Sequence, residues 1–303
     1  MDPKTILLGG LLAIALVYFV FWTVTVRRQR AARRDSSSIK PTPLQVAIGF
    51  VTNFFDTLGI GSFATTTAMY RAWKIVPDEQ IPGTLNVGHA AATFVQALIY
   101  ITIVEVEFIT LMSIIAAAVV GAWLGAGIVC SFSRRKVQLG MGFALIGAAV
   151  LMLTSLTGVG PPPGEALGLS GPLLWTAIGA SAVLGALMML GIGYYAPCLI
   201  MISLLGMNPT AAFPIMMGAC AFLIPVGSLQ FIRKERYDLR GALGLLVGGP
   251  FAVLIAAYIV TSLPLNYVRW GVVIVVLYTA ISMLRTAAAE RKRAGTATDP
   301  APV

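Results

Sequence analysis

Long apolar segments decide what class of protein this chain can form. Seven segments have at least about 20 residues and almost no charge, enough for a helix to cross the ~30 Å hydrocarbon core of a bilayer. They are residues 5–26, 84–104, 108–132, 137–157, 211–232, 239–263 and 265–284. Only 11% of all residues are charged, against about 25% in soluble domains. The sequence predicts an all-α polytopic membrane protein.

Two further apolar segments, residues 44–74 and 172–207, are interrupted by glycines. The same tripeptide occurs in both, as Gly59-Ile60-Gly61 and as Gly191-Ile192-Gly193. Each glycine costs a helix about 1 kcal/mol, and a break at membrane depth survives only where protein or water covers it. An arm of about 14 residues reaches only ~21 Å as a helix. We expect two re-entrant hairpins; kinked full spans are the alternative.

The basic residues are distributed in a way that favours the hairpins. They lie in the loops at 27–40, 134–136 and 233–240 and in the tail at 285–293. Loops rich in Lys and Arg face the cytoplasm. All four groups do so only if segments 44–74 and 172–207 each return to the side from which they entered. The net charge of +9 therefore reflects topology, and we expect no nucleic acid as a partner. The N-terminus is predicted outside and the C-terminus in the cytoplasm.

The two halves of the chain then have the same elements in opposite orientation. Residues 44–157 form a hairpin and three spans that start inside, and residues 172–285 form the same elements starting outside. This is an inverted-topology repeat. Residues 1–43 add an N-terminal transmembrane helix and a basic cytoplasmic loop, 158–171 form an extracytoplasmic loop, and 286–303 form a flexible cytoplasmic tail. Broken helices at equivalent places in two inverted halves indicate a transporter's binding site.

Polar side chains surround the first break and suit a small oxyanion. A helix that restarts after the glycines offers unpaired N–H groups and a positive dipole end, and Ser62 is placed to cap it. From this half we expect substrate contacts with Asn53, Thr57, Gly59, Ile60, Gly61, Ser62, Thr65 and Thr66. The alternative is that the glycines only permit close helix packing.

Asp56 is the only acidic residue well inside an apolar segment. Ionisable groups at that depth are costly and usually functional. Asp56 could carry a coupling proton or cation, or it could accept N–H groups at the break. An anionic carboxylate repels an anionic substrate, so coupling or structure is favoured over direct contact.

A polar stripe follows the first hairpin. Its members recur every three or four residues and share one helix face, which should point into the bundle; they are Asn86, His89, Thr93, Gln96 and Tyr100. The first four are further candidate substrate contacts. His89 is the only histidine and could donate to an oxyanion, relay a proton or simply pack. The proton-coupling candidates are thus Asp56 and His89. No further metal-ligating residue joins His89, so we expect neither a metal nor another cofactor.

The second break has fewer polar neighbours and is expected to complete the cavity. Its candidate substrate contacts are Gly191, Ile192, Gly193, Tyr194, Tyr195 and Cys198. No Lys or Arg lies in the middle of an apolar segment. A bound anion would be held by helix ends and hydroxyl groups, which favours a weakly hydrated or partly protonated anion.

The motifs Asp56-Thr57-Leu58-Gly59-Ile60-Gly61-Ser62 and Leu190-Gly191-Ile192-Gly193, placed in inverted halves, resemble the sulfite exporter TauE/SafE family, also called the toluene sulfonate uptake permease family. The resemblance covers about residues 44–284 and departs from the family at Tyr194 and Tyr195. It implies a secondary transporter that exports a small sulfur-containing anion such as sulfite across the bacterial cytoplasmic membrane.

The resemblance leaves alternatives open. They are a passive small-anion channel and an uptake permease for thiosulfate or an organosulfonate. The expected partners are the anion, the lipid bilayer and protons as a coupling ion, and a homo-oligomer is compatible with the sequence. An enzyme is not expected, because the sequence has no Ser/His/Asp arrangement and no metal-binding motif.

Overall fold

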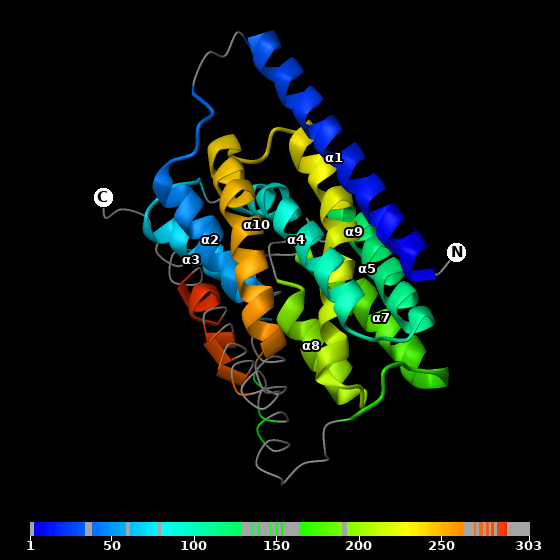
Figure 1. Ribbon diagram of the computed structural model, residues 1–303. Coiled ribbons are helices and arrows are strands. Elements are labelled where there is room, and N and C mark those ends of the chain that lie inside the picture. The colour runs from blue at the N-terminus through cyan, green and yellow to red at the C-terminus, as the bar shows by residue number, and fades with distance from the viewer. Residues whose placement is uncertain are drawn as a thin grey trace.

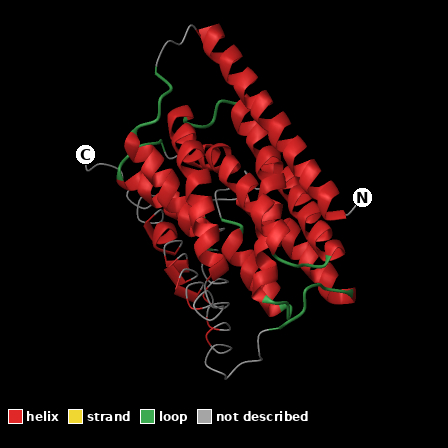
Figure 2. Ribbon diagram, in the orientation of Figure 1, coloured by secondary structure: helices red, strands yellow, loops and turns green. Residues whose placement is uncertain are grey.

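The computed structural model describes residues 3–33, 38–58, 61–77, 80–128, 164–189 and 193–262, with scattered residues between 135 and 153 and between 270 and 289. The regular secondary structure of these parts is helical apart from one isolated bridge between Ala166 and Met207, and loops connect the helices (Figures 1 and 2). The helices are α1 (Pro3–Arg33), α2 (Pro43–Thr57), α3 (Ser62–Ala72), α4 (Ile81–Ile103), α5 (Phe108–Ile128), α7 (Gly171–Met188), α8 (Tyr195–Leu204), the 3-10 turn η3 (Pro209–Ala211), α9 (Ala212–Arg233) and α10 (Leu239–Ser262).

Six of these helices are long and apolar enough to cross a membrane. Five of them, α1, α4, α5, α9 and α10, match spans expected from the sequence. The expected spans 137–157 and 265–284 lie outside the continuously described residues. The sixth is α7, whose 18 residues exceed the expected arm of about 14. That expectation was too short because segment 172–207 is 36 residues long, so its first arm, residues 172–190, has 19 residues.

Both ends of the α2–α3 pair lie at one end of the bundle. Just before α2, the Lys40 carbonyl accepts a bond of 3.2 Å from Arg240 Nε. Near the end of α3, the Tyr70 hydroxyl donates to the Gly241 carbonyl over 3.0 Å. Both partners belong to the start of α10. We call this the basic end, because its loops carry Lys40, Lys74, Arg236 and Arg240.

Both ends of the α7–α8 pair lie at the opposite end. The Glu107 N–H, between α4 and α5, donates to the Leu167 carbonyl over 2.8 Å, and the Asn208 N–H, after α8, donates to the Ala166 carbonyl over 2.8 Å. We call this the acidic end, after Glu105, Glu107 and Glu165. Figure 1 shows α2–α3 and α7–α8 approaching the middle of the bundle from opposite ends.

Small residues set the main helix contacts, which join α2 to α10, α5 to α7, and α4 to α9. At the first contact, a Cβ atom on Gly49 would lie only 2.7 Å from the Gly244 carbonyl oxygen. At the second, a Cβ on Gly185 would clash with the Ala118 backbone. Such close backbone approach is how helices gain dispersion energy in lipid, where burial supplies little driving force. Helix α1 lies outside this bundle against α4 and α9.

Candidate functional site

The two helix breaks meet in the middle of the bundle. Gly59, Ile60, Gly191 and Ile192, which the sequence places in the site, lie outside the described residues, but their flanks are described. A Cβ atom on Gly193 would lie 4.0 Å from Phe63 Cβ. Gly61 has a φ of +83°, a conformation that glycine adopts without steric cost, and it turns the chain into α3. The described residues that flank the two breaks, 56–58 with 61–63 and 188–189 with 193–195, are therefore in contact, and we call these flanks the tips.

Asp56 is a hydrogen-bond acceptor for the start of α3. Its Oδ1 accepts the Ser62 backbone N–H over 2.5 Å, and its Oδ2 accepts Gln96 Nε2 over 3.1 Å. We expected the Ser62 side chain to cap α3, but Ser62 lies in the first turn and the Asp56 carboxylate caps its N–H from the preceding helix. The positive φ of Gly61 folds the chain back so that this carboxylate can reach.

His89 joins the first hairpin to α4. Its Nδ1 lies 2.9 Å from Asn53 Oδ1, and its Nε2 lies 3.2 Å from Thr66 Oγ1. Asn53 donates its amide N–H to the Gly49 carbonyl, so its Oδ1 is the acceptor and His89 Nδ1 must carry the proton. A neutral ring then accepts from Thr66 at Nε2. The ring also stacks on Phe63, with the two centroids 5.6 Å apart.

This arrangement bears on the expected role of His89. Both ring nitrogens are already used, so His89 has no spare N–H for an oxyanion unless Thr66 gives up its bond. Asn53, Thr66 and His89 have no exposed surface. In this conformation the three side chains fasten α2, α3 and α4 together; whether His89 also carries a proton stays a prediction.

Gln96 connects the two hairpins. Its Nε2 donates to Thr57 Oγ1 over 2.9 Å as well as to Asp56, and its Oε1 accepts the Tyr195 hydroxyl over 2.7 Å. Tyr195 belongs to α8, and Asp56 and Thr57 belong to α2. The polar stripe of α4 is buried, as expected, and Gln96 is the member that reaches both tips.

The other predicted residues make mostly local bonds. Thr65 donates to the Ser62 carbonyl over 2.9 Å, and Thr93 donates to the Ala90 carbonyl over 2.9 Å. Tyr194 shares a 2.6 Å bond with Ser181 of α7, and Cys198 is a buried thiol outside any disulfide.

Sequence reasoning missed two residues at this centre. Phe63 and Ser181 make contacts between helices, but neither stands out in the sequence, because a lone Phe or Ser in an apolar segment has no periodic pattern around it.

The second break has a polar atom that lacks a partner. Asn86 donates to the Pro82 carbonyl, but its Oδ1 has no hydrogen-bond partner. A Cβ on Gly227 would clash with Met189 at the end of α7 and would lie 3.9 Å from Asn86 Oδ1. Ser228 of α9 follows Gln96 by 132 residues, the spacing of the two glycine motifs, but its side chain faces Tyr18 of α1.

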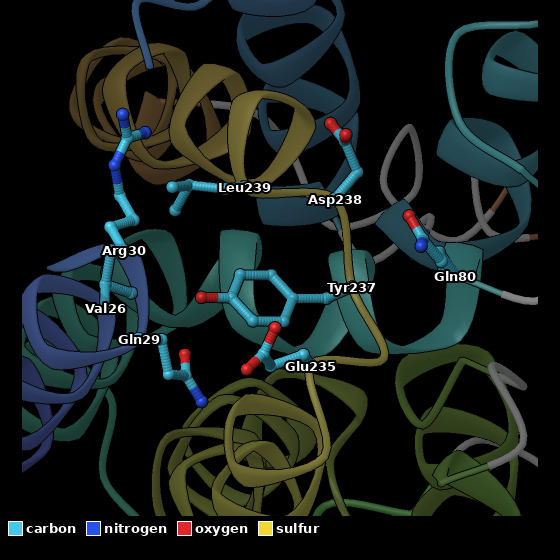
Figure 3. A pocket seen from close by; sticks show the side chains of 8 residues that line it. All are labelled: Val26, Gln29, Arg30, Gln80, Glu235, Tyr237, Asp238 and Leu239. Atoms are coloured by element: carbon cyan, nitrogen blue, oxygen red, sulfur yellow. The ribbon is translucent and has the colours of Figure 1, made fainter. Parts of the chain in front are cut away.

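A pocket of about 270 Å³ opens at the basic end (Figure 3). It is lined by the end of α1, by Gln80 and by the α9–α10 loop; the lining residues are Val26, Gln29, Arg30, Gln80, Glu235, Tyr237, Asp238 and Leu239. The Tyr237 hydroxyl accepts Trp22 Nε1 over 3.0 Å. Burial raises the pKa of Tyr237 to about 12. The pocket is lined by carboxylates, amides and a guanidinium and lies apart from the two breaks.

Comparison with known protein families bears directly on this arrangement. The model of the sulfite exporter TauE/SafE family matches residues 2–152, which hold α1–α5 and the first break. The chain belongs to this family. No curated protein and no solved structure matches it. Membership of the sulfite exporter family, together with the six apolar helices, makes the chain a multi-pass membrane protein of a transporter family.

Proposed function

We propose that this protein is a secondary transporter that exports a small sulfur-containing anion such as sulfite, with the substrate held where the two hairpin tips meet. Family membership supports the sulfur anion as substrate class. We assign the site to the tips because they are in contact: Gly193 lies against Phe63, and Tyr195 bonds to Gln96. Backbone N–H groups at broken helices are anion ligands that need no Lys or Arg.

The helix contacts support an inverted repeat of residues 44–157 and 172–285. The 132-residue spacing superposes α2 on α7, α3 on α8, α4 on α9, and α5 on α10. Under that exchange, the α2–α10 contact becomes the α7–α5 contact, and the α4–α10 contact becomes the α9–α5 contact. The α4–α9 contact maps onto itself. A two-fold axis in the membrane plane would pass between α4 and α9, beside the tips, as alternating access requires.

The charges at the two ends support one orientation. The basic end faces the cytoplasm if Lys and Arg follow their usual preference, which places the N-terminus outside and the C-terminus inside the bacterial cytoplasmic membrane. Single cysteines at Ser38 and Glu165, introduced after replacing Cys130, Cys198 and Cys220, test this. In intact cells, an impermeant thiol reagent should label the Glu165→Cys variant and spare the Ser38→Cys variant. The reverse pattern would overturn the orientation.

Flux measurements in proteoliposomes test the transport function itself. Radiolabelled sulfite uptake should saturate and show counterflow, and Gly59→Leu or Gly191→Leu should abolish it by filling the breaks. Gly9→Leu is the matched control, because nothing lies within 4 Å of a Cβ at Gly9. Unchanged flux in both tip variants would refute the site. Ohmic currents without counterflow would instead identify a passive channel.

Coupling is part of the same proposal, with Asp56 and His89 as the proton-carrying candidates. Asp56 is buried in contact with both α3 and α4. A proton gradient imposed across the vesicles should change the rate of sulfite flux in the parent protein. Asp56→Asn or His89→Ala should remove that change if the residue carries the proton, and a response that survives in both variants would exclude both residues.

A further inference from the structure

We propose that Gln96 transmits the protonation state of Asp56 to the second hairpin through Tyr195. The inference rests on the proposed function, since it gives the coupling proton a structural consequence. It concerns three side chains in line: Asp56 of α2, Gln96 of α4 and Tyr195 of α8. Their bonds measure 3.1 Å from Gln96 Nε2 to Asp56 Oδ2 and 2.7 Å from the Tyr195 hydroxyl to Gln96 Oε1.

The direction of each bond follows from the chemistry of the groups. A carboxylate can only accept hydrogen bonds, whereas an amide has one donor side and one acceptor side. With Asp56 ionised, Gln96 must turn its NH₂ group toward Asp56 and Thr57, which it does. Its oxygen then faces α8 and can accept only from a donor, which Tyr195 provides. The charge on Asp56 thereby fixes the link to the second hairpin.

A proton on Asp56 reverses this order. Oδ1 already accepts the Ser62 N–H, so the new O–H at Oδ2 would point at the NH₂ group of Gln96, and two donors would face each other. A half-turn of the Gln96 amide relieves this by presenting its oxygen to Asp56. The NH₂ group then faces Tyr195 and donates to its hydroxyl oxygen, so the bond reverses its direction and the Tyr195 hydroxyl hydrogen loses its acceptor. The proton comes from water and returns to water, and no covalent bond of the protein breaks.

Asp56 is the carboxylate of this network, and the groups that face it come from α4, α8, α9 and α10. On α4, His89 is held by Asn53 and Thr66, and Tyr100 donates to the Thr57 carbonyl. The thiols of Cys198 on α8 and Cys220 on α9 also lie near this network; phenols and thiols are neutral at neutral pH. The buried residues of α10, which covers α2, are apolar or glycine. Among the described residues, no other carboxylate and no Lys or Arg faces Asp56.

The contact between the tips supplies a readout that needs no substrate. Phe63 Cβ lies 4.0 Å from the position of a Cβ on Gly193, within the separation of about 3.5–4.5 Å that a disulfide spans. The parent for the test carries Phe63→Cys and Gly193→Cys, with Cys130, Cys198 and Cys220 replaced. The rate of oxidative cross-linking then reports how firmly the second tip is held against the first. Because thiol oxidation itself depends on pH, every rate is compared with that of Tyr195→Phe at the same pH.

The relay predicts a specific pattern of rates. At about pH 8 the parent should cross-link about fivefold faster than Tyr195→Phe, and this ratio should fall as the pH is lowered and Asp56 takes up its proton; fivefold is about 1 kcal/mol, the net worth of one hydrogen bond. Asp56→Asn, whose amide donates to Gln96 as a protonated Asp56 would, should cross-link more slowly than the parent at about pH 8, with a ratio to Tyr195→Phe that does not change with pH. Tyr70→Phe also loses a tyrosine hydroxyl bond, but far from Gln96, and should follow the parent.

Two outcomes would overturn the relay. One is a parent-to-Tyr195→Phe ratio that does not change with pH, which would mean that Tyr195 has a structural role only. The other is an Asp56→Asn variant that retains the parent's rates. Neither measurement uses an anion, so a failure of sulfite flux would refute the proposed function and leave the relay tested on its own.

Discussion

The hydrogen bonds that join His89 to Asn53 and Thr66, which we call the His89 clamp, give the sharpest stability prediction for this protein. His89→Leu keeps most of the side-chain volume but removes the bonds to Asn53 and Thr66. Asn53 Oδ1 would be left buried without a donor, which costs about 2 kcal/mol. The Thr66 hydroxyl can turn to a carbonyl of its own helix, so its loss is about 1 kcal/mol. We expect the free energy of unfolding to fall by about 3 kcal/mol.

A double-mutant cycle separates the clamp from general disruption of the core. Thr66→Val should cost about 1 kcal/mol in the wild type and almost nothing in the His89→Leu background, because its partner is already gone. Thr93→Val is the matched control. Thr93 is buried on α4, the helix that carries His89, but bonds only to the Ala90 carbonyl one turn back. Its replacement should change stability by no more than about 0.5 kcal/mol.

Unfolding in mixed detergent micelles, followed by circular dichroism as the fraction of denaturing detergent rises, measures these free energies. A His89→Leu protein within about 0.5 kcal/mol of the wild type would refute the clamp. So would strict additivity of His89→Leu and Thr66→Val, since additive effects mean that the two side chains do not interact.

Two further predictions concern a helix contact and a loop. Gly49→Ala places a Cβ 2.7 Å from the Gly244 carbonyl oxygen and should lower the free energy of unfolding by about 1–3 kcal/mol. Gly9→Ala, with open space around it, should stabilise the protein by up to about 1 kcal/mol. Equal effects of the two variants in detergent unfolding would contradict this. Burial raises the pKa of Tyr237 from 10.0 to about 12, so the folded protein keeps a phenol proton that the unfolded chain releases. Its contribution to stability is complete below about pH 10 and is lost between pH 10 and about pH 12. Tyr237→Phe should remove this alkaline loss in melting curves and, by leaving Trp22 Nε1 without its acceptor, cost about 1 kcal/mol at neutral pH. A wild-type alkaline profile in that variant would contradict the assignment.

The placement of the helices follows from two sequence signals. Apolar length predicts α1, α4, α5, α9 and α10, because lipid forces the backbone of any crossing segment to bond within itself. The glycine pairs, read together with the basic loops, predict two helix pairs that enter from opposite ends. The length of α7 was underestimated because one arm length of about 14 residues was assumed for both broken segments, although the first arm of segment 172–207 has 19 residues before Gly191.

Side-chain roles are harder to read from the sequence, because tertiary neighbours decide them. The spacing of Asn86, His89, Thr93 and Gln96 predicts a shared, buried face, since helical periodicity is a property of one segment. It does not predict that His89 meets Asn53 and Thr66, or that Gln96 meets Tyr195, 99 residues away. For the same reason Ser62 was expected to cap α3, whereas a carboxylate from α2 does so.

The two breaks differ in how their polar groups are satisfied, and the difference bears on coupling. At the first break, the Asp56 carboxylate occupies the start of α3, where a substrate oxyanion would also bind; at the second, Asn86 Oδ1 is buried without a partner. An anion approaching α3 must compete with an ionised Asp56 for the same N–H. Protonation of Asp56 weakens that competition, so proton and anion would each raise the other's affinity, as thermodynamic linkage requires. The same proton would reverse the bond between Gln96 and Tyr195 and leave the Tyr195 hydroxyl hydrogen without an acceptor, so a single charge change would govern both anion binding and the contact between the hairpins.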